Sequence, residues 1–156
     1  MSNETSLREL LVRSLDWDSA HIRFEEATKD FPSELRGQRP AGAPHTPWQL
    51  LEHLRITLWD ILEFSRDAKH VSPEFPAGYW PASDTPADDA TWDQSIVQYR
   101  NDLQALAELT MDPSVDLYTP ISHGSGQTIL REVLLTLDHN AYHLGQFMFV
   151  RKSLGA

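Results

Sequence analysis

The segment VSPEFPAGYWPASDTPADD, residues 71–89, restricts the possible folds of this chain more than any other stretch of it. It contains four prolines and one glycine, and proline lacks the backbone N–H group that regular helices and central strands require. We therefore expect a long irregular connection near the middle of the chain. On both sides of it apolar residues recur at helical spacing, and no strand-like alternation is evident. The pattern predicts an all-α protein.

Two helices are expected before this connection and two after it. They cover about residues 4–29, 46–68, 88–109 and 127–155. The second has the clearest start, because Thr46 is a capping residue, Pro47 suits the first helical position, and Gln49 completes a capping box. The fourth follows a glycine-bearing turn at residues 123–126.

The lengths of the connections predict how these helices are arranged. Short loops usually join antiparallel neighbours. The connection between the second and third helices has about 20 residues, which is enough to return along a helix of ~30 Å. These two helices are therefore expected to be parallel. The predicted fold is a single domain over residues 1–156, a four-helix bundle in up-down-down-up order with a long crossover between its second and third helices.

Composition excludes several classes of function. The formal net charge is −10 and Lys and Arg form no cluster, which argues against a nucleic-acid partner. The chain has no cysteine, so any metal ion must be held by His, Asp or Glu. The N-terminus lacks the pattern of a signal peptide, and no apolar run approaches the ~20 residues that span a bilayer. We expect a cytoplasmic enzyme or binding protein without a membrane partner.

Two histidines, His139 and His143, lie four residues apart in the fourth helical segment, within DHNAYHLGQ. Residues at positions i and i+4 share one helix face, so both imidazoles can reach the same ion. The zinc motif HExxH uses this spacing, but Asn140 stands where that motif has its glutamate. This difference excludes a metalloprotease that takes its general base from that position.

A third ligand is needed, and His53 is the best candidate because it lies between Leu50 and Leu54 on the second helix. The less favourably placed histidines are His21, His45 and His70. His123 could reach the mouth of the site as an acid or base, or it could only shape its turn. Gln146 shares a face with His143 and could donate a hydrogen bond near a metal ion, or be an ordinary surface residue.

The same pattern has a plainer interpretation, in which the histidines are solvated. One apolar stripe of the fourth segment consists of Leu130, Leu134, Leu137, Ala141, Leu144 and Met148. His139 and His143 lie on the other side, together with Glu132 and Thr136. However, Leu135, Tyr142 and Phe149 run beside them, so that side is not purely polar. The spacing alone leaves the metal site and the solvated face as alternatives.

Several neighbours of the histidines are also assigned by position. Glu52 and Asp138 precede ligand candidates directly, so they are expected to face elsewhere and be solvated or lie at a partner surface. Asp60 is two turns beyond His53 and is expected to line the pocket without touching that imidazole. The aromatic residues of the crossover could form a wall of the site or only pin the connection to the bundle; they are Phe75, Tyr79 and Trp80.

The stretches WQLLEHL, residues 48–54, and DHNAYHLGQ, residues 138–146, resemble the DinB-like (DinB/YfiT) superfamily of small helical bundles. The resemblance covers nearly the whole chain, including the order of the helices and the long second connection. It implies a homodimer and a divalent metal ion held by His53, His139 and His143. Zinc and nickel both suit such imidazole ligation. Some members of the superfamily are metal-dependent enzymes that use low-molecular-weight thiols.

These observations lead to two hypotheses about function. The first is a metal-dependent enzyme, either a thiol-dependent transferase or a hydrolase acting on a small molecule, with His123 and Gln146 as candidate catalytic residues. The second is a non-catalytic dimeric helical module that binds a metal ion or a ligand. The sequence does not separate them, because the same three histidines serve both.

Overall fold

In a computed structural model of the protein, residues 3–156 are described and form five α-helices. These are α1 (Asn3–Leu15), α2 (Phe24–Thr28), α3 (Pro47–Arg66), α4 (Asp89–Met111) and α5 (Ile129–Ser153). Two 3₁₀ turns lie in the connections, namely η1 (Ser33–Leu35) and η2 (Ala77–Tyr79). No β-strand occurs within residues 3–156, which confirms the all-α prediction.

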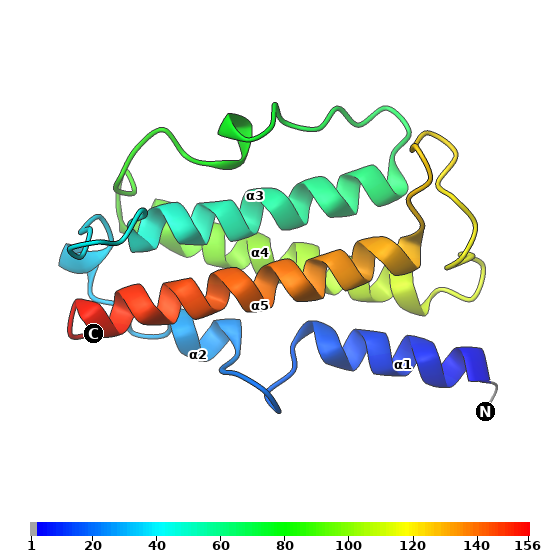
Figure 1. The fold of residues 1–156 in the computed structure, drawn as a ribbon, viewed down its shortest axis with the longest axis horizontal. Helices are drawn as coiled ribbons and strands as arrows, with labels where there is room; N and C mark the ends of the chain where they lie inside the picture. Colours follow the sequence, from blue (N-terminus) through cyan, green and yellow to red (C-terminus); the bar gives the residue numbers. More distant parts are fainter. Residues whose placement is uncertain (1–2) are drawn as a thin grey trace.

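The helices α1, α3, α4 and α5 lie roughly along one common direction (Figure 1). α3 and α4 run the same way, and α1 and α5 run the opposite way. The connection between α3 and α4, residues 67–88, returns along α3. α3 packs against α4 and α5, and α1 packs against the same two helices.

The described helices, all within residues 3–156, include none with the length and apolar character needed to cross a membrane.

The prediction of one continuous helix over residues 4–29 is wrong. α1 ends at Leu15, and the short α2 begins only at Phe24. The residues between them include Asp16, Asp18 and Ser19, whose side chains compete with the backbone for hydrogen bonds. Both aspartates pair with Arg23. The break turns the chain so that the ring of Phe24 stacks on Tyr99 of α4, with 3.9 Å between the ring centroids.

Side-chain caps mark the starts of the three longest helices. At α3, Gln49 N donates to Thr46 Oγ1 at 3.2 Å and Thr46 N donates to Gln49 Oε1 at 3.1 Å, which confirms the predicted capping box. Asp88 caps α4 and Thr128 caps α5 through their own side chains. Thr46 also donates to the carbonyl of Asp84 at 2.7 Å, so this cap ties α3 to the long connection.

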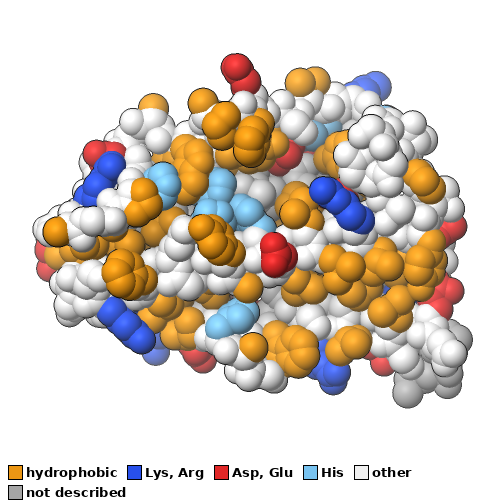
Figure 2. Space-filling model, viewed as in Figure 1, with side chains coloured by type: hydrophobic (Ala, Val, Ile, Leu, Met, Phe, Trp, Pro, Cys, Tyr) orange, Lys and Arg blue, Asp and Glu red, His pale blue; other side chains and the backbone are white. Residues whose placement is uncertain are grey.

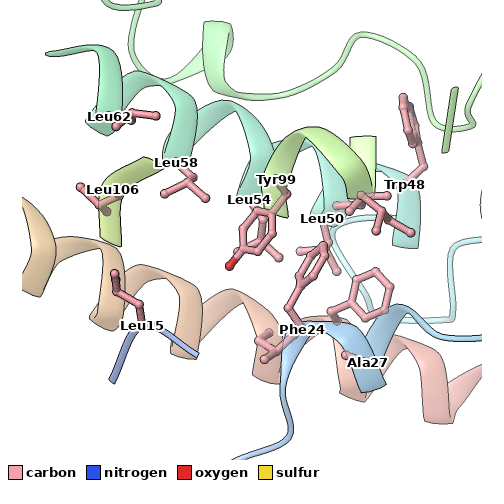
Figure 3. Packing of buried hydrophobic residues seen from close by; sticks show 14 of the residues in the cluster. Leu15, Phe24, Ala27, Trp48, Leu50, Leu54, Leu58, Leu62, Tyr99 and Leu106 are labelled. Carbon is pink, nitrogen blue, oxygen red and sulfur yellow. The ribbon is translucent and has the colours of Figure 1, made fainter. Parts of the chain in front are cut away.

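The hydrophobic core lies where α3 faces its neighbours. Its α3 leucines are nearly or fully buried, and they are Leu50, Leu51, Leu54, Leu58 and Leu62. Figure 3 shows side chains from α1, α2, α3 and α4 directed into this one cluster. Full burial of a leucine contributes about 1.5–3 kcal/mol relative to its exposure. The cluster therefore fixes α3, the helix that carries His53.

The buried face of α5 differs from the apolar stripe read from the sequence. Leu134, expected in the core, is 50% exposed, whereas Glu132 and Thr136, expected on the opposite side, are buried. These polar groups have partners, since Glu132 accepts from Arg131 at 2.7 Å and Thr136 donates to the carbonyl of Glu132 at 3.0 Å. A helix that is apolar on more than one side does not reveal its inner face by pattern alone.

Candidate metal centre

Three histidines from two helices meet near the surface of the molecule. His53 lies on α3, and His139 and His143 lie on α5. Nε2 of His53 is 3.1 Å from Nε2 of His143 and 3.0 Å from Nε2 of His139. The three candidate ligand atoms all lie within 4.8 Å of one another. On the face shown in Figure 2, histidine side chains gather between hydrophobic ones.

Hydrogen bonds on the far side of two rings orient these nitrogens. Nδ1 of His53 lies 2.9 Å from the carbonyl oxygen of Tyr79, which can only accept, so Nδ1 must carry the proton. Nδ1 of His143 lies 2.9 Å from Oε1 of Gln146 and donates to it. A neutral imidazole has one N–H group, so the Nε2 atoms of His53 and His143 both present lone pairs. The short approach between them is therefore a contact between two acceptors.

A metal ion fits this arrangement better than hydrogen bonds do. Two lone pairs that face each other at 3.1 Å repel unless a cation lies between them. Two imidazole nitrogens bound to one zinc ion at ~2.0–2.1 Å are about 3.4 Å apart at a tetrahedral angle, close to the separations found here. Three protein ligands leave a position for a substrate, as catalytic rather than structural zinc sites do.

Burial keeps the three imidazoles in the neutral form. Burial, with smaller contributions from the neighbouring His143 and His53, lowers the pKa of His139 to about 3. Burial and then the nearby His53 lower the pKa of His143 to about 4. Burial also lowers the pKa of His53, although its bond to the Tyr79 carbonyl acts in the opposite direction. Because metal ions bind neutral imidazole, these ligands need no deprotonation near pH 7.

The sequence model of the DinB superfamily matches residues 16–147, which include all three histidines. The chain belongs to the DinB superfamily. No curated protein and no solved structure matches this DinB-superfamily chain.

An aromatic side chain from the crossover covers the histidines of this DinB-superfamily protein. The indole of Trp80 stacks on the ring of His53, with centroids 3.8 Å apart and planes inclined by 1°. Its other neighbour is His45, also at 3.8 Å, with an inclination of 13°. Trp80 thus lies between two imidazoles and shields one face of His53 from water. From the sequence, the aromatic residues of the crossover could form a wall of the site or only pin the connection to the bundle. Trp80 forms a wall of the site.

Asp60 acts on the site through the crossover and not by contact with a ligand. The hydroxyl of Tyr79 donates to Asp60 Oδ2 at 2.6 Å, and His70 Nε2 lies 2.7 Å from Asp60 Oδ1. Burial and the bond to this carboxylate raise the pKa of Tyr79 to about 12. Since the carbonyl of Tyr79 orients His53, the carboxylate anchors the segment that supplies that acceptor.

The two acidic neighbours of the ligands have different environments. Asp138 is exposed, as expected. Glu52 is buried, contrary to the expectation that it is solvated or at a partner surface. Its two oxygens accept from Nε and Nη2 of Arg55 at 2.7 and 2.8 Å. This ion pair within α3 satisfies the buried carboxylate, which explains how a charged side chain is accommodated there.

Of the two residues predicted as catalytic, the structure brings only Gln146 to the histidines. His123 is exposed, and its Nε2 lies 2.7 Å from the carbonyl oxygen of Phe64. Phe64 is eleven residues beyond His53 on α3, about 16 Å along the axis at ~1.5 Å per residue. His123 therefore closes the turn before α5 onto the far part of α3, away from the three imidazoles.

The carbonyl of Tyr79, the group that orients His53, was not predicted from the sequence. A backbone carbonyl carries no residue-type signal, and the contact spans 26 residues of chain. The available signal was the pair of adjacent aromatic residues, Tyr79 and Trp80, in an otherwise irregular connection. Their role depends on where the crossover lies on α3, which only the folded chain defines.

Proposed function

We propose that this protein is a metal-dependent enzyme that holds one divalent ion, zinc or nickel, through Nε2 of His53, His139 and His143. The contact at 3.1 Å between two acceptor nitrogens carries the proposal, because a cation removes the repulsion that the contact otherwise creates. Imidazole ligands suit both metals. The family match supports the proposal, since it includes these residues.

The residues around the histidines would bind and orient, and not react themselves. Tyr79 and Gln146 hold two rings so that their Nε2 atoms converge, and Trp80 keeps water from one face of His53. Oε1 of Gln146 is engaged by His143, which leaves its amide nitrogen as a donor for a substrate oxygen. A bound divalent ion acts as a Lewis acid that polarises a substrate and lowers the pKa of water or a thiol.

The reaction proposed is the transfer of a low-molecular-weight thiol to an electrophile, or a hydrolysis. The chain has no cysteine, so any thiol must come as a substrate. One observation favours a non-catalytic binding module instead. Within residues 3–156, the hydrogen bonds of the three imidazoles involve no carboxylate, so the site has no adjacent general base of that type.

Metal content and turnover test the proposal together. Purified protein is expected to contain about one zinc or nickel ion per chain, and His53→Ala is expected to lose it. His21→Ala is the matched control, because His21 is exposed and its Nδ1 bonds to the neighbouring carbonyl of Ile22, away from the three histidines. If His53→Ala retains the metal as tightly as the unmodified protein, the proposed ligand set is wrong.

Thiol consumption with a panel of electrophiles then separates the two functions. Metal-dependent consumption that is lost in His53→Ala supports the enzyme. A protein that binds metal but turns over no thiol and no ester or amide substrate in the panel is a binding module.

A further inference from the structure

A pocket of about 330 Å³ is lined by residues that contact the surroundings of the three histidines. It is lined by Gly42, Ala43, Pro44, His45, Leu50, Tyr142, Gly145, Gln146, Phe149 and Val150. Two lining residues connect it to the candidate metal centre. Gln146 accepts a hydrogen bond from His143, and His45 stacks on the indole that in turn stacks on His53. A molecule in this pocket is therefore separated from His143 by the side chain of Gln146, and from His53 by His45 and Trp80.

Gly145 lines this pocket and has no conformational reason to be glycine. It falls inside α5, where glycine weakens the helix relative to alanine. Its φ is not positive, and a Cβ atom at this position would meet nothing within 4 Å. Neither backbone geometry nor close packing explains the residue. A side chain at this position would occupy the pocket.

The walls of the pocket define the chemistry of its occupant. None of the described residues that line it is Asp, Glu, Lys or Arg. Leu50 and Val150 are buried at its base, and Tyr142 and Phe149 stand 63% and 64% exposed at its rim. The volume is at the lower end of the range of about 300–1,000 Å³ for small-molecule sites. An uncharged apolar group, such as a substituted ring or a short alkyl chain, fits these walls.

A larger pocket, of about 460 Å³ between α2 and α4, differs in character. Seven of its lining residues are charged, namely Glu25, Glu26, Lys29, Asp30, Arg36, Asp93 and Arg100. Phe31, Trp92, Ile96 and Val97 also line it, but its charged side chains suit an uncharged apolar group less well.

We propose that the pocket near the histidines binds the uncharged apolar part of the substrate, an aryl or short alkyl group, and that Gly145 keeps it open. This inference rests on the proposed function, since it places the reacting head of the same molecule at His53, His139 and His143. It assigns the specificity of the reaction to the outer face of α5 and the segment before α3.

Hydroxamates with one metal-binding head and different tails test the inference. Acetohydroxamate and hexanohydroxamate are titrated into the zinc-loaded protein by calorimetry. We expect the longer tail to bind at least tenfold more tightly. In Gly145→Leu, which fills open space and strengthens the helix, this preference is expected to fall to within twofold while acetohydroxamate binds as before. Lys152→Leu is the matched control, because it adds the same side chain on α5 outside the pocket and should keep the preference.

Each outcome separates the pocket from the metal site. Equal affinity for both hydroxamates, or a preference that survives Gly145→Leu, overturns the pocket and leaves the metal site standing. A protein that takes up no zinc overturns the proposed function. The pocket is then tested with 1-hexanol on the metal-free protein by NMR, where binding that Gly145→Leu removes supports it and absence of binding overturns it.

A second copy of the chain is the alternative occupant. If Gly145→Leu converts a dimer into a monomer in light scattering and leaves the hydroxamate preference unchanged, this face of α5 is an interface between copies. That result would overturn the substrate pocket and support the homodimer that the family resemblance implies.

Discussion

At the scale of single residues, the site depends on acceptors that hold the imidazoles from behind. Gln146 and the carbonyl of Tyr79 place a proton on Nδ1 and so direct the lone pair of Nε2 inward. Groups in this position commonly change metal affinity by 10–100-fold when they are removed.

Replacement of Gln146 by leucine should therefore weaken zinc binding by about tenfold, because the ring of His143 loses the acceptor that orients it. Gln146→Glu keeps an acceptor oxygen and should restore most of the affinity. Competition against a chromophoric chelator measures both variants. Equal affinity of the leucine variant and the unmodified protein would show that His143 is oriented by packing alone.

The burial of His139 and His143 makes the metal-free protein sensitive to acid. The pKa values of His139 and His143 fall from 6.5 to about 3 and about 4 on folding. Below pH ~6.5 the unfolded chain therefore binds protons that the folded chain does not, and stability decreases as the pH falls toward 4. Urea denaturation of the chelator-treated protein between pH 7 and pH 4 should show this loss. A shallower pH dependence is expected in His139→Gln, which no longer titrates there.

At the scale of secondary-structure elements, the cap of α3 determines where the helix carrying His53 begins. Thr46 is fully buried, accepts from Gln49 N and donates to the carbonyl of Asp84. Thr46→Ala should lower the free energy of unfolding by about 1–2 kcal/mol, because the N–H group of Gln49 and the carbonyl of Asp84 both lose their partner. Thr85→Ala, at an exposed threonine of the same connection, should change it by less than ~0.5 kcal/mol. Chemical denaturation measures the free energy of unfolding of both variants. If Thr46→Ala and Thr85→Ala lose the same amount, α3 does not begin at the Thr46 cap.

At the scale of the whole molecule, an ion held by the histidines would link α3 to α5. Metal that binds only the folded state stabilises it by about 2.7 kcal/mol at a hundredfold excess over Kd. A chelator should therefore lower the melting temperature of the metal-loaded protein. In His53→Ala the chelator should have almost no effect, since the link between the helices is already lost. A chelator effect of the same size in both proteins would mean that the stabilising ion binds elsewhere.

Much of the fold and part of the site depend on local interactions, and these were predictable from the sequence. The capping box at Thr46, the irregular proline-rich connection and the placement of His139 and His143 on one helix face all follow from neighbours within a few residues. Such features need only backbone geometry and side-chain type. The all-α class follows from the same periodicity.

The remaining features depend on contacts between distant segments, and only the tertiary structure decided them. Packing selects the inner face of α5, because that helix is apolar on more than one side. The approach of His53 to His143 joins residues 90 apart in the chain, and the Tyr79 carbonyl reaches His53 only because the crossover lies along α3. In each case a long-range contact outweighs a local preference, and that contact exists only in the folded chain.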